Sequence, residues 1–543
     1  MKKVSRLIIV LLLMVSAVTT LIFMGLNGYG FSGGNAQSTA AGTAKLHLSD
    51  EEFSLGVGEE YQCSAFTADG TKTEEVRWSC SDISIAEVDN HGNVTGIAPG
   101  EAEIRVRYSE NIIVSAKLWV YDINTVSSST ANAVTLLATD GSDASFQAMT
   151  DLARQLKCAK SNAVTRYSAL LNALLHFSEM GAGSSHSPSQ CWEELKTALT
   201  NTGIKGIEED TLRRAALTAY CHGEKLVNDV TISFAGDCTF AYFNETDKDN
   251  MFPAVYRKSG SLTYPLDLTK NVFGADDLTM VNLEGTLTDT RKHRDKTFYF
   301  RGEPEYVNIL TNSSVEAVTV ENNHSFDYLE DGYADTLSNL KKAGVRYTGL
   351  YSPATIDVNG YHVVMLSLSM VSTYYKPEYQ ATIESDIKKY RSDDKTIIIV
   401  NLHWGVETSG TPEKWQIEAA HSMIDAGADM IIGHHPHVLQ GIEQYKGHYI
   451  VYSLGNFSFG GNSAAASPST VIFRASFNED GAGNLTTRVS VVPCYTTSSG
   501  STVNNFRPTP LFGNQGQGVV DRLLSLSGRL DGGITQINWN RIP

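Results

Sequence analysis

Short strand-like runs, each leading into a polar residue, recur along the second half of the chain. They cover residues 230–235, 278–283, 315–320, 396–401 and 430–432. Stretches with helical character lie between them, and one runs from Thr411-Pro412 to Gly427, with proline suited to a first helical turn and glycine to a stop. This alternation predicts an α/β domain over residues 228–500.

A different pattern occupies residues 45–122. Apolar and polar side chains alternate there, as at 103–108 and 116–120, with turn signals between the runs. A period of two indicates half-buried strands, and this spacing of turns is typical of a β sandwich. The segment resembles the bacterial Ig-like domain of group 2, on the motifs at 78–82, 85–89 and 92–100. That resemblance implies a spacer or adhesive module and no catalytic role.

The rest of the chain outside the α/β segment is less informative. Residues 131–226 repeat apolar side chains at helical spacing, and a Ser/Thr-rich linker is expected before them at 124–130. Their histidines (176, 186 and 222) show no ligand spacing and are expected to be surface or capping residues. Residues 501–543, rich in glycine, asparagine and serine, are expected to form a loose tail with a short helix near 518–526.

The amino terminus predicts the compartment. Three basic residues precede an almost uncharged stretch at 7–24, long enough for a membrane helix. We interpret residues 1–26 as an uncleaved anchor and 27–44 as a flexible linker, with a cleaved signal peptide as the alternative. Positive charge before the span places the bulk of the chain outside the cell membrane, as a single-pass protein.

Composition agrees with an exported protein. The 543 residues carry a formal charge of -17, which argues against nucleic acid as a partner. Seven cysteines make an odd count. An oxidising compartment permits disulfides, and Cys63 and Cys80 are candidates to pair because they lie in one predicted β domain.

The chemistry is expected at the strand ends of the α/β domain. Strand carboxyl ends are where open α/β sheets bind ligands. The candidate metal ligands there are Asp237, Glu284, Asn323, His403, His434, His435 and His437. Carboxylates, imidazoles and an amide oxygen suit one or two divalent ions, with manganese, iron and zinc as candidates. His324 is placed to protonate a leaving group, and Asp327 to orient it.

An ordered series of motifs resembles the bacterial capsule synthesis protein family, also called CapA or PgsA. The motifs are Gly-Asp at 236, Asn-Leu-Glu-Gly at 282, Phe-Arg-Gly-Glu-Pro at 300, Asn-Asn-His-Ser-Phe-Asp-Tyr at 322, His-Trp-Gly-Val-Glu at 403, Gly-His-His-Pro-His-Val-Leu-Gln-Gly at 433 and Tyr-Ser-Leu-Gly-Asn-Phe at 452. Within them, Arg301, Glu407 and Asn456 are the candidate substrate contacts.

The resemblance implies a two-sheet α/β sandwich similar to calcineurin-like metallophosphatases, with a dinuclear metal centre. It also implies a membrane-anchored part in making or exporting poly-γ-glutamate, an anionic surface polymer, with other capsule synthesis membrane proteins as candidate partners.

Two departures from the phosphatase pattern leave the mechanism open. Thr239 stands where those enzymes have the histidine of Asp-x-His, and Glu284 stands where they have a bridging aspartate. Within the histidine cluster we expect His435 and His437 to be the ligands, with His434 close by. Three hypotheses follow: a metal-dependent hydrolase or transferase, a non-catalytic polymer-binding protein, and an adhesion protein acting through the Ig-like segment.

Overall fold

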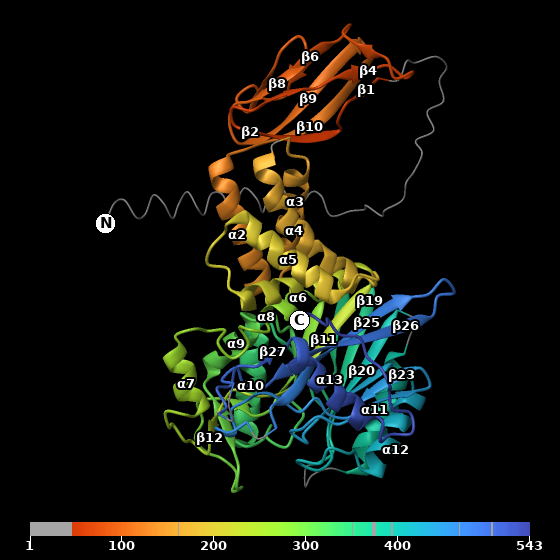
Figure 1. Ribbon diagram of the computed structural model, residues 1–543. Helices are drawn as coiled ribbons and strands as arrows, with labels where there is room; N and C mark the ends of the chain where they lie inside the picture. The colour runs from red at the N-terminus through yellow and green to blue at the C-terminus, as the bar shows by residue number, and fades with distance from the viewer. Residues whose placement is uncertain are drawn as a thin grey trace.

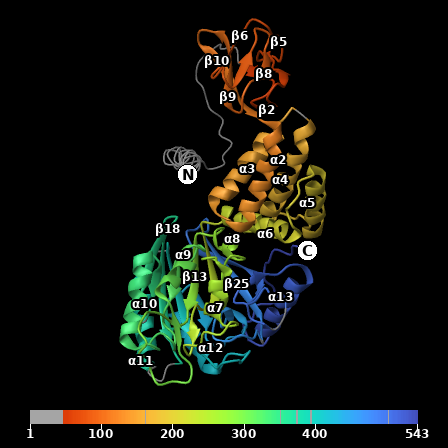
Figure 2. The same cartoon turned by 90° about the vertical axis from the view of Figure 1, so that its left-hand side faces the viewer.

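The computed structural model describes residues 46–543 except 161, 350, 372–375, 392–394, 466 and 501–502. The predicted anchor at 1–26 and linker at 27–44 lie outside these residues. Within the described part, no helix combines the length and the apolar character that crossing a membrane requires. Three bodies follow one another along an elongated molecule: a β domain, a group of helices and a larger α/β body (Figures 1 and 2).

The β domain is built from small sheets around one core. Its longest strands alternate as predicted: β9 (Gly100–Ser109) buries Ala102, Ile104 and Val106 and exposes the residues between them. The strands are β1 (His47–Leu48), β2 (Glu52–Gly56), β3 (Glu60–Gln62), β4 (Ala65–Phe66), β5 (Lys72–Thr73), β6 (Arg77–Cys80), β7 (Ala86–Val88), β8 (Asn93–Gly96), β9 and β10 (Ile112–Tyr121). The predicted pairing of Cys63 with Cys80 is wrong, because both thiols are free. Cys63 is buried beside the Ser49 hydroxyl, and Cys80 donates to the carbonyl of Asp82.

The helical region starts earlier than the sequence indicated. Its helices are α2 (Ile123–Thr139), α3 (Asp143–Lys157), α4 (Asn162–Gly181), α5 (Pro188–Thr202) and α6 (Glu209–Leu226). The predicted linker at 124–130 is the first part of α2. Asp122 caps this helix by accepting a hydrogen bond from the amide of Asn124, and Val126 and Thr130 are buried on its inner face. The cap and the burial outweigh the weak helix propensity of the Ser/Thr-rich stretch.

Helices α4 and α6 touch backbone to backbone at two glycines. A Cβ atom added to Gly223 would lie 1.8 Å from the carbonyl oxygen of Ser178, and one added to Gly181 would lie 2.0 Å from that of Tyr220. Neither neighbour is a side chain that can rotate away. The crossing therefore depends on the absence of side chains at these positions.

We expect Gly223→Ala to lower the free energy of unfolding by about 3 kcal/mol, because the helices must separate to admit the methyl group. Gly518 is the matched control: it lies in a helix with nothing within 4 Å of its added Cβ. Gly518→Ala is expected to stabilise the protein by roughly 0.5–1 kcal/mol through helix propensity. Calorimetric unfolding of both variants measures whether their free energies of unfolding change in opposite directions. Equal changes in the two variants would contradict the close packing of α4 and α6.

The α/β body is a sandwich of two sheets, as predicted. The first sheet has the order β17-β16-β13-β11-β25-β26-β27, with β24 also pairing β11. Its strands are β11 (Val230–Thr239), β13 (Leu278–Leu283), β16 (Ala317–Thr319), β17 (Arg346–Thr348), β24 (Asn456–Phe459), β25 (Ser469–Glu479), β26 (Leu485–Tyr495) and β27 (Thr509–Pro510).

The second sheet has the order β18-β19-β20-β21-β23-β22. Its strands are β18 (Ala354–Val358), β19 (Tyr361–Ser369), β20 (Thr396–His403), β21 (Met430–His434), β22 (Ile442–Tyr445) and β23 (His448–Val451). Residues of both sheets, such as Phe234 on β11 and Ile399 on β20, share one buried core. The inner layer of the sandwich is thus apolar.

Helices cover the outer faces of both sheets. The second sheet packs its other face on α11 (Pro377–Tyr390) and α12 (Lys414–Asp425). The first sheet shares a core with α6 and with short helices of the α/β body. The remaining elements are α7 (Phe252–Ser259), α8 (Lys270–Phe273), α9 (Val307–Thr311), α10 (Leu329–Ala343), the 3-10 helix Pro304–Tyr306, and a small sheet of β12 (Tyr242–Phe243), β15 (Phe300–Gly302) and β14 (Thr286–Leu287).

The carboxyl-terminal residues are part of the sandwich, and the expectation of a loose tail at 501–543 is wrong. Helix α13 (Gly513–Ser527) contains the predicted helix at 518–526 and buries Val519, Val520 and Leu523. Ile542, at the very end, is also fully buried. The apolar stripe of α13 docks this segment even though glycine and asparagine are common around it.

Candidate metal centre

The predicted ligands gather at one edge of the sandwich because parallel strands of both sheets end there. Asp237 lies on β11, and Glu284 directly follows β13. His403 and His434 end the neighbouring strands β20 and β21 and stand beside each other in register. The loop after β16 brings Asn323 to the same edge, where its side-chain oxygen lies 2.8 Å from His403 Nε2.

Asp237, Glu284 and His403 form the inner group. Each offers a ligand atom, these atoms all lie within 4.8 Å of one another, and all three residues are buried. His437 Nδ1 is 3.1 Å from an oxygen of Asp237, and its Nε2 is 3.8 Å from Glu284. His434 Nδ1 is 3.5 Å from the other oxygen of Asp237. The structure thus brings the carboxylates and the imidazoles of both sheets together.

A second group lies on the solvent side of the first. Glu407, His435 and His437 also have ligand atoms within 4.8 Å of one another, and Glu407 is exposed. His435 and His437 both have positive φ angles, 98° and 59°, which non-glycine residues rarely adopt. Such strain is typical of functional loops. Glu407, predicted as a substrate contact, thus lies within reach of an ion held by His435 and His437.

His324 is oriented by Asp327, which was predicted from the sequence, and Asp327 is in turn bound by Lys296, which was not. Its Nδ1 is 2.6 Å from Asp327, as predicted for an orienting carboxylate. Lys296 donates to the other oxygen of Asp327, Oδ1, at 2.7 Å. The amide of Phe300 donates at 2.8 Å to Oδ2, the oxygen that faces His324. This leaves His324 Nε2 facing Glu284, at 3.8 Å. Lys296 was missed, although it belongs to a basic run at 291–296 that was a visible signal.

Asn282 is a second residue without a predicted role. Its side-chain nitrogen donates to Asp237 at 2.8 Å and lies 3.4 Å from His403 Nδ1. It fixes the orientation of a ligand from each sheet. Its place at the end of β13, inside the Asn-Leu-Glu-Gly motif, was the available signal.

The prediction that Arg301 contacts substrate is wrong. Its side chain is fully buried, and its guanidinium binds Glu245, Glu303 and the carbonyl of Thr288. Every face of the group is therefore committed to the protein. Glu245 also accepts a hydrogen bond from Tyr328, so Arg301 stiffens a wall behind the centre.

A cavity of about 600 Å³ opens beside the centre. His324, His437, Glu407 and Asn456 form its polar side, and Asn456 Oδ1 lies 2.9 Å from His437 Nδ1. Lys248 adds a positive charge at the rim. Four aromatic side chains, Phe243, Phe298, Phe300 and Phe459, share the rest of the lining with Met251 and with further polar residues such as Asn250 and Asn462. Asn456 therefore lines the cavity, and its role as a substrate contact stays a prediction.

The electrostatics of the inner group favour a cation. Burial raises the pKa of Glu284 to about 8, and both of its carboxylate oxygens are buried without a hydrogen-bond partner among the described residues. Burial lowers the pKa of His435 to about 4 and that of His403 well below its usual value, so these imidazoles are neutral. Burial opposes the charge on Asp237, but the His434 and His437 rings beside its carboxylate outweigh burial and hold its pKa well below normal.

Burial lowers the pKa of His437, but Glu284 and Asp237 outweigh burial and raise it to about 9. The buried oxygens of Glu284 are costly unless a positive charge satisfies them, and either a protonated His437 or a bound cation that displaces its proton supplies that charge. The donor set of oxygen and nitrogen atoms matches manganese, iron or zinc. The residues therefore fit a divalent metal, with Asp237, Glu284, His403 and His437 as the inner donors and Asn323, His434 and His435 beside them.

The two-sheet sandwich with this cluster at its strand ends defines a metallophosphatase-like domain. Residues 231–461 match the family model described as bacterial capsule synthesis protein PGA_cap, and residues 43–110 match the bacterial Ig-like domain, group 2. The α/β domain is thus similar to the bacterial capsule synthesis protein family, and the β domain before it is similar to the bacterial Ig-like domain.

Relatives of the α/β domain have related descriptions. The PGA biosynthesis protein CapA of Bacillus subtilis is 33% identical over 211 residues, 35% of this chain and 54% of that protein. The capsule biosynthesis protein CapA of Bacillus anthracis is 33% identical over 188 residues, 30% and 45% of the two chains. A probable polyglutamine synthesis accessory protein of Mycobacterium tuberculosis is 28% identical over 210 residues, 34% and 55%. The chain spans about half the length of these relatives.

Proposed function

We propose that this protein is a membrane-anchored, extracytoplasmic component of capsule polymer synthesis or export that acts on poly-γ-glutamate through a divalent metal centre. The observation that supports the metal centre is Glu284, whose two buried carboxylate oxygens lack a hydrogen-bond partner within the part of the chain that the structure describes, while His403 and His437 lie beside it. The polymer is inferred from the relatives, one described as a PGA biosynthesis protein and another as a capsule biosynthesis protein. The anchor is inferred from the sequence of residues 1–26.

The residues of the centre have distinct roles in this proposal. Asp237, Glu284, His403, His437 and Asn323 hold the metal. A bound divalent ion supplies Lewis acidity and lowers the pKa of a water molecule.

Burial lowers the pKa of His324 and its Nδ1 is bound to Asp327, so its Nε2 is an acceptor that first takes a proton from the attacking water and then passes it to the leaving atom. Asp327 and Lys296 hold the ring so that this nitrogen faces the centre. The cavity beside the centre gives room for a segment of polymer, and Lys248 attracts an anionic chain.

A non-catalytic polymer-binding role is the second candidate, and Thr239 favours it. This residue replaces the histidine of Asp-x-His, and its buried hydroxyl oxygen has no hydrogen-bond partner. A centre that lacks this ligand is expected to hold its second ion weakly. A single firmly bound ion suits binding of polymer carboxylates better than hydrolysis by a metal pair.

Metal content separates the two roles. We expect elemental analysis of the purified full chain to show two more ions per molecule than the Asp237→Asn/His403→Ala variant, because these substitutions remove a donor from each sheet. His421→Ala is the control: His421 binds Glu443 at 2.8 Å outside the centre, and its loss is expected to leave the metal content unchanged.

A difference of one ion would shift the assignment to polymer binding. No difference would overturn the metal centre itself. With two ions confirmed, release of products from poly-γ-glutamate by the chain, and not by the double variant, is the expected catalytic result.

A further inference from the structure

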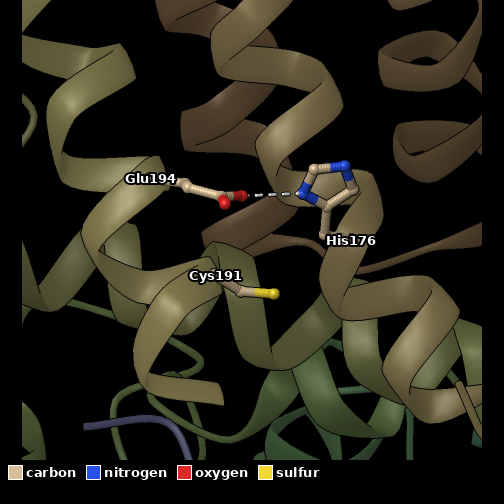
Figure 3. A group of neighbouring side chains, drawn as sticks. All are labelled: His176, Cys191 and Glu194. Carbon is tan, nitrogen blue, oxygen red and sulfur yellow. Dashed lines mark hydrogen bonds and ion pairs between the residues drawn. The ribbon is translucent and has the colours of Figure 1, made fainter. Parts of the chain in front are cut away.

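A second cluster of metal-binding side chains lies in the helical region, away from the sandwich (Figure 3). His176 comes from α4, and Cys191 and Glu194 come from α5; their ligand atoms all lie within 4.8 Å of one another. His176 Nδ1 is 3.2 Å from a carboxylate oxygen of Glu194, and the Cys191 sulfur points into the same space. The family match at 231–461 does not include these residues.

The fold explains why the three side chains converge. Helix α5 follows α4 after the loop at 182–187, and both helices contribute to one apolar core. Cys191 and Glu194 are three residues apart, so they share a face of α5. That face is turned toward His176. Linear spacing carries no ligand motif here because the donors come from two helices, which is why His176 was expected to be an ordinary surface residue.

We propose that His176, Cys191 and Glu194 form a zinc site that clamps α4 to α5, with water as the fourth ligand. Zinc is the ion suited to a set of one thiolate, one imidazole and one carboxylate, whereas calcium and magnesium select oxygen ligands alone. Donors in a tetrahedral zinc site lie roughly 3–4 Å apart. Small side-chain rotations therefore bring these three donors from 4.8 Å to bonding positions.

The surroundings prepare the cluster for an ion. His186 stacks on the His176 ring, with centroids 5.3 Å apart and planes 12° apart, and pairs with Glu179 at 3.0 Å. This contact fixes the plane of His176, so its Nδ1 stays directed at the cluster. The side chain of Glu194 is 58% exposed, which gives an ion access from solvent. Cys191 is buried, and burial raises the pKa of its thiol, so it is an unreactive thiol until a metal displaces the proton.

Cobalt(II) is the probe, because a cobalt–thiolate bond gives a charge-transfer band in the near ultraviolet that nitrogen and oxygen ligands do not give. We expect the full chain, stripped of metal, to develop this band on titration with cobalt and to lose it when one equivalent of zinc is added. Cys191→Ser and His176→Ala are each expected to abolish the band. Circular dichroism of the variants verifies that the helices remain folded.

Matched variants separate this site from the centre in the sandwich and from other thiols. Cys158, half-buried at the end of α3, is the control cysteine, and Cys158→Ser is expected to keep the full band. Asp237→Asn/His403→Ala removes donors of the proposed catalytic centre and is also expected to keep it. A band that is absent from the unsubstituted chain, or that survives in Cys191→Ser, would overturn the zinc site and leave the proposed function untouched.

Discussion

Glu284→Gln is expected to weaken metal binding in the sandwich by more than about a hundredfold, the upper limit for losing an outer-shell partner of a metal ligand. Glutamine keeps the size of the side chain but removes the negative charge and one acceptor oxygen. Glu284 is buried, and neither of its oxygens has a hydrogen-bond partner among the described residues, so no described protein group substitutes for the lost ligand. Competition with a chelator of known affinity, using manganese and zinc, measures the change.

The same substitution is expected to abolish polymer formation in cells that depend on this protein. Glu443→Gln is the matched control, because Glu443 is also a buried carboxylate but binds His421 and Tyr452 instead of the centre. It is expected to lower stability without changing metal affinity. Glu407→Gln, at the exposed edge of the centre, is expected to lower the metal affinity by less than tenfold. Equal metal affinity in Glu284→Gln and the unsubstituted chain would exclude Glu284 as a ligand.

Much of the centre could be predicted from sequence because each ligand ends a recognisable strand. Asp237, Glu284 and His403 follow buried apolar runs, and the ends of parallel strands meet at one edge of a sheet. The strand pattern does not show how the two sheets pack on each other. The prediction that the ends of β11 and β13 lie near those of β20 and β21 therefore depended on the family resemblance, which implied the two-sheet sandwich.

Residues in loops were harder to place. Arg301 lies in a strand-like motif beside the predicted centre, yet its guanidinium points inward to Glu245 and Glu303. This direction depends on Glu245, which lies in a loop 56 residues earlier in the sequence. Lys296 reaches Asp327 for a similar long-range reason. Ligand identity at strand ends is a local property, whereas the direction of a long side chain is decided by distant charges.

The region at 501–543 illustrates a limit of composition. Glycine, asparagine and serine suggested a loose tail, but a few apolar residues at helical spacing on α13 were enough to dock the segment. The Ser/Thr-rich start of α2 is a comparable case, in which one capping aspartate and two buried side chains outweigh propensity. In both segments tertiary burial overrides a weak local preference.

Arg474 shows how firmly the helical region is joined to the sandwich. It lies on β25 with its side chain fully buried. Its guanidinium donates to Glu224 of α6 at 2.9 Å and to Ser233 of β11 at 3.1 Å. It also donates to the carbonyls of Cys221, Val272 and Ala275. One side chain therefore links a helix of the middle body to two strands of the first sheet.

We expect Arg474→Met to lower the free energy of unfolding by about 3–5 kcal/mol, the cost of leaving a buried charge without its partner. The loss arises because Glu224 and the carbonyl oxygens stay buried with nothing to satisfy them. Lys414→Met is the control: Lys414 pairs with Glu418 on the surface, and its removal is expected to have no measurable effect. Urea unfolding followed by circular dichroism provides the comparison.

The double variant Glu224→Gln/Arg474→Met tests the cause of that loss. Removing the stranded carboxylate is expected to recover at least a third of the stability, because much of the penalty belongs to the unpaired charge and not to the lost bonds. A double variant as unstable as Arg474→Met would assign the loss to packing instead. Because Arg474 binds both bodies, we also expect the helical region and the sandwich of the unsubstituted protein to unfold in one transition. In Arg474→Met the helices are expected to unfold first. A single transition in the unsubstituted protein would mean that its helices form a rigid stalk between the sandwich and the Ig-like domain.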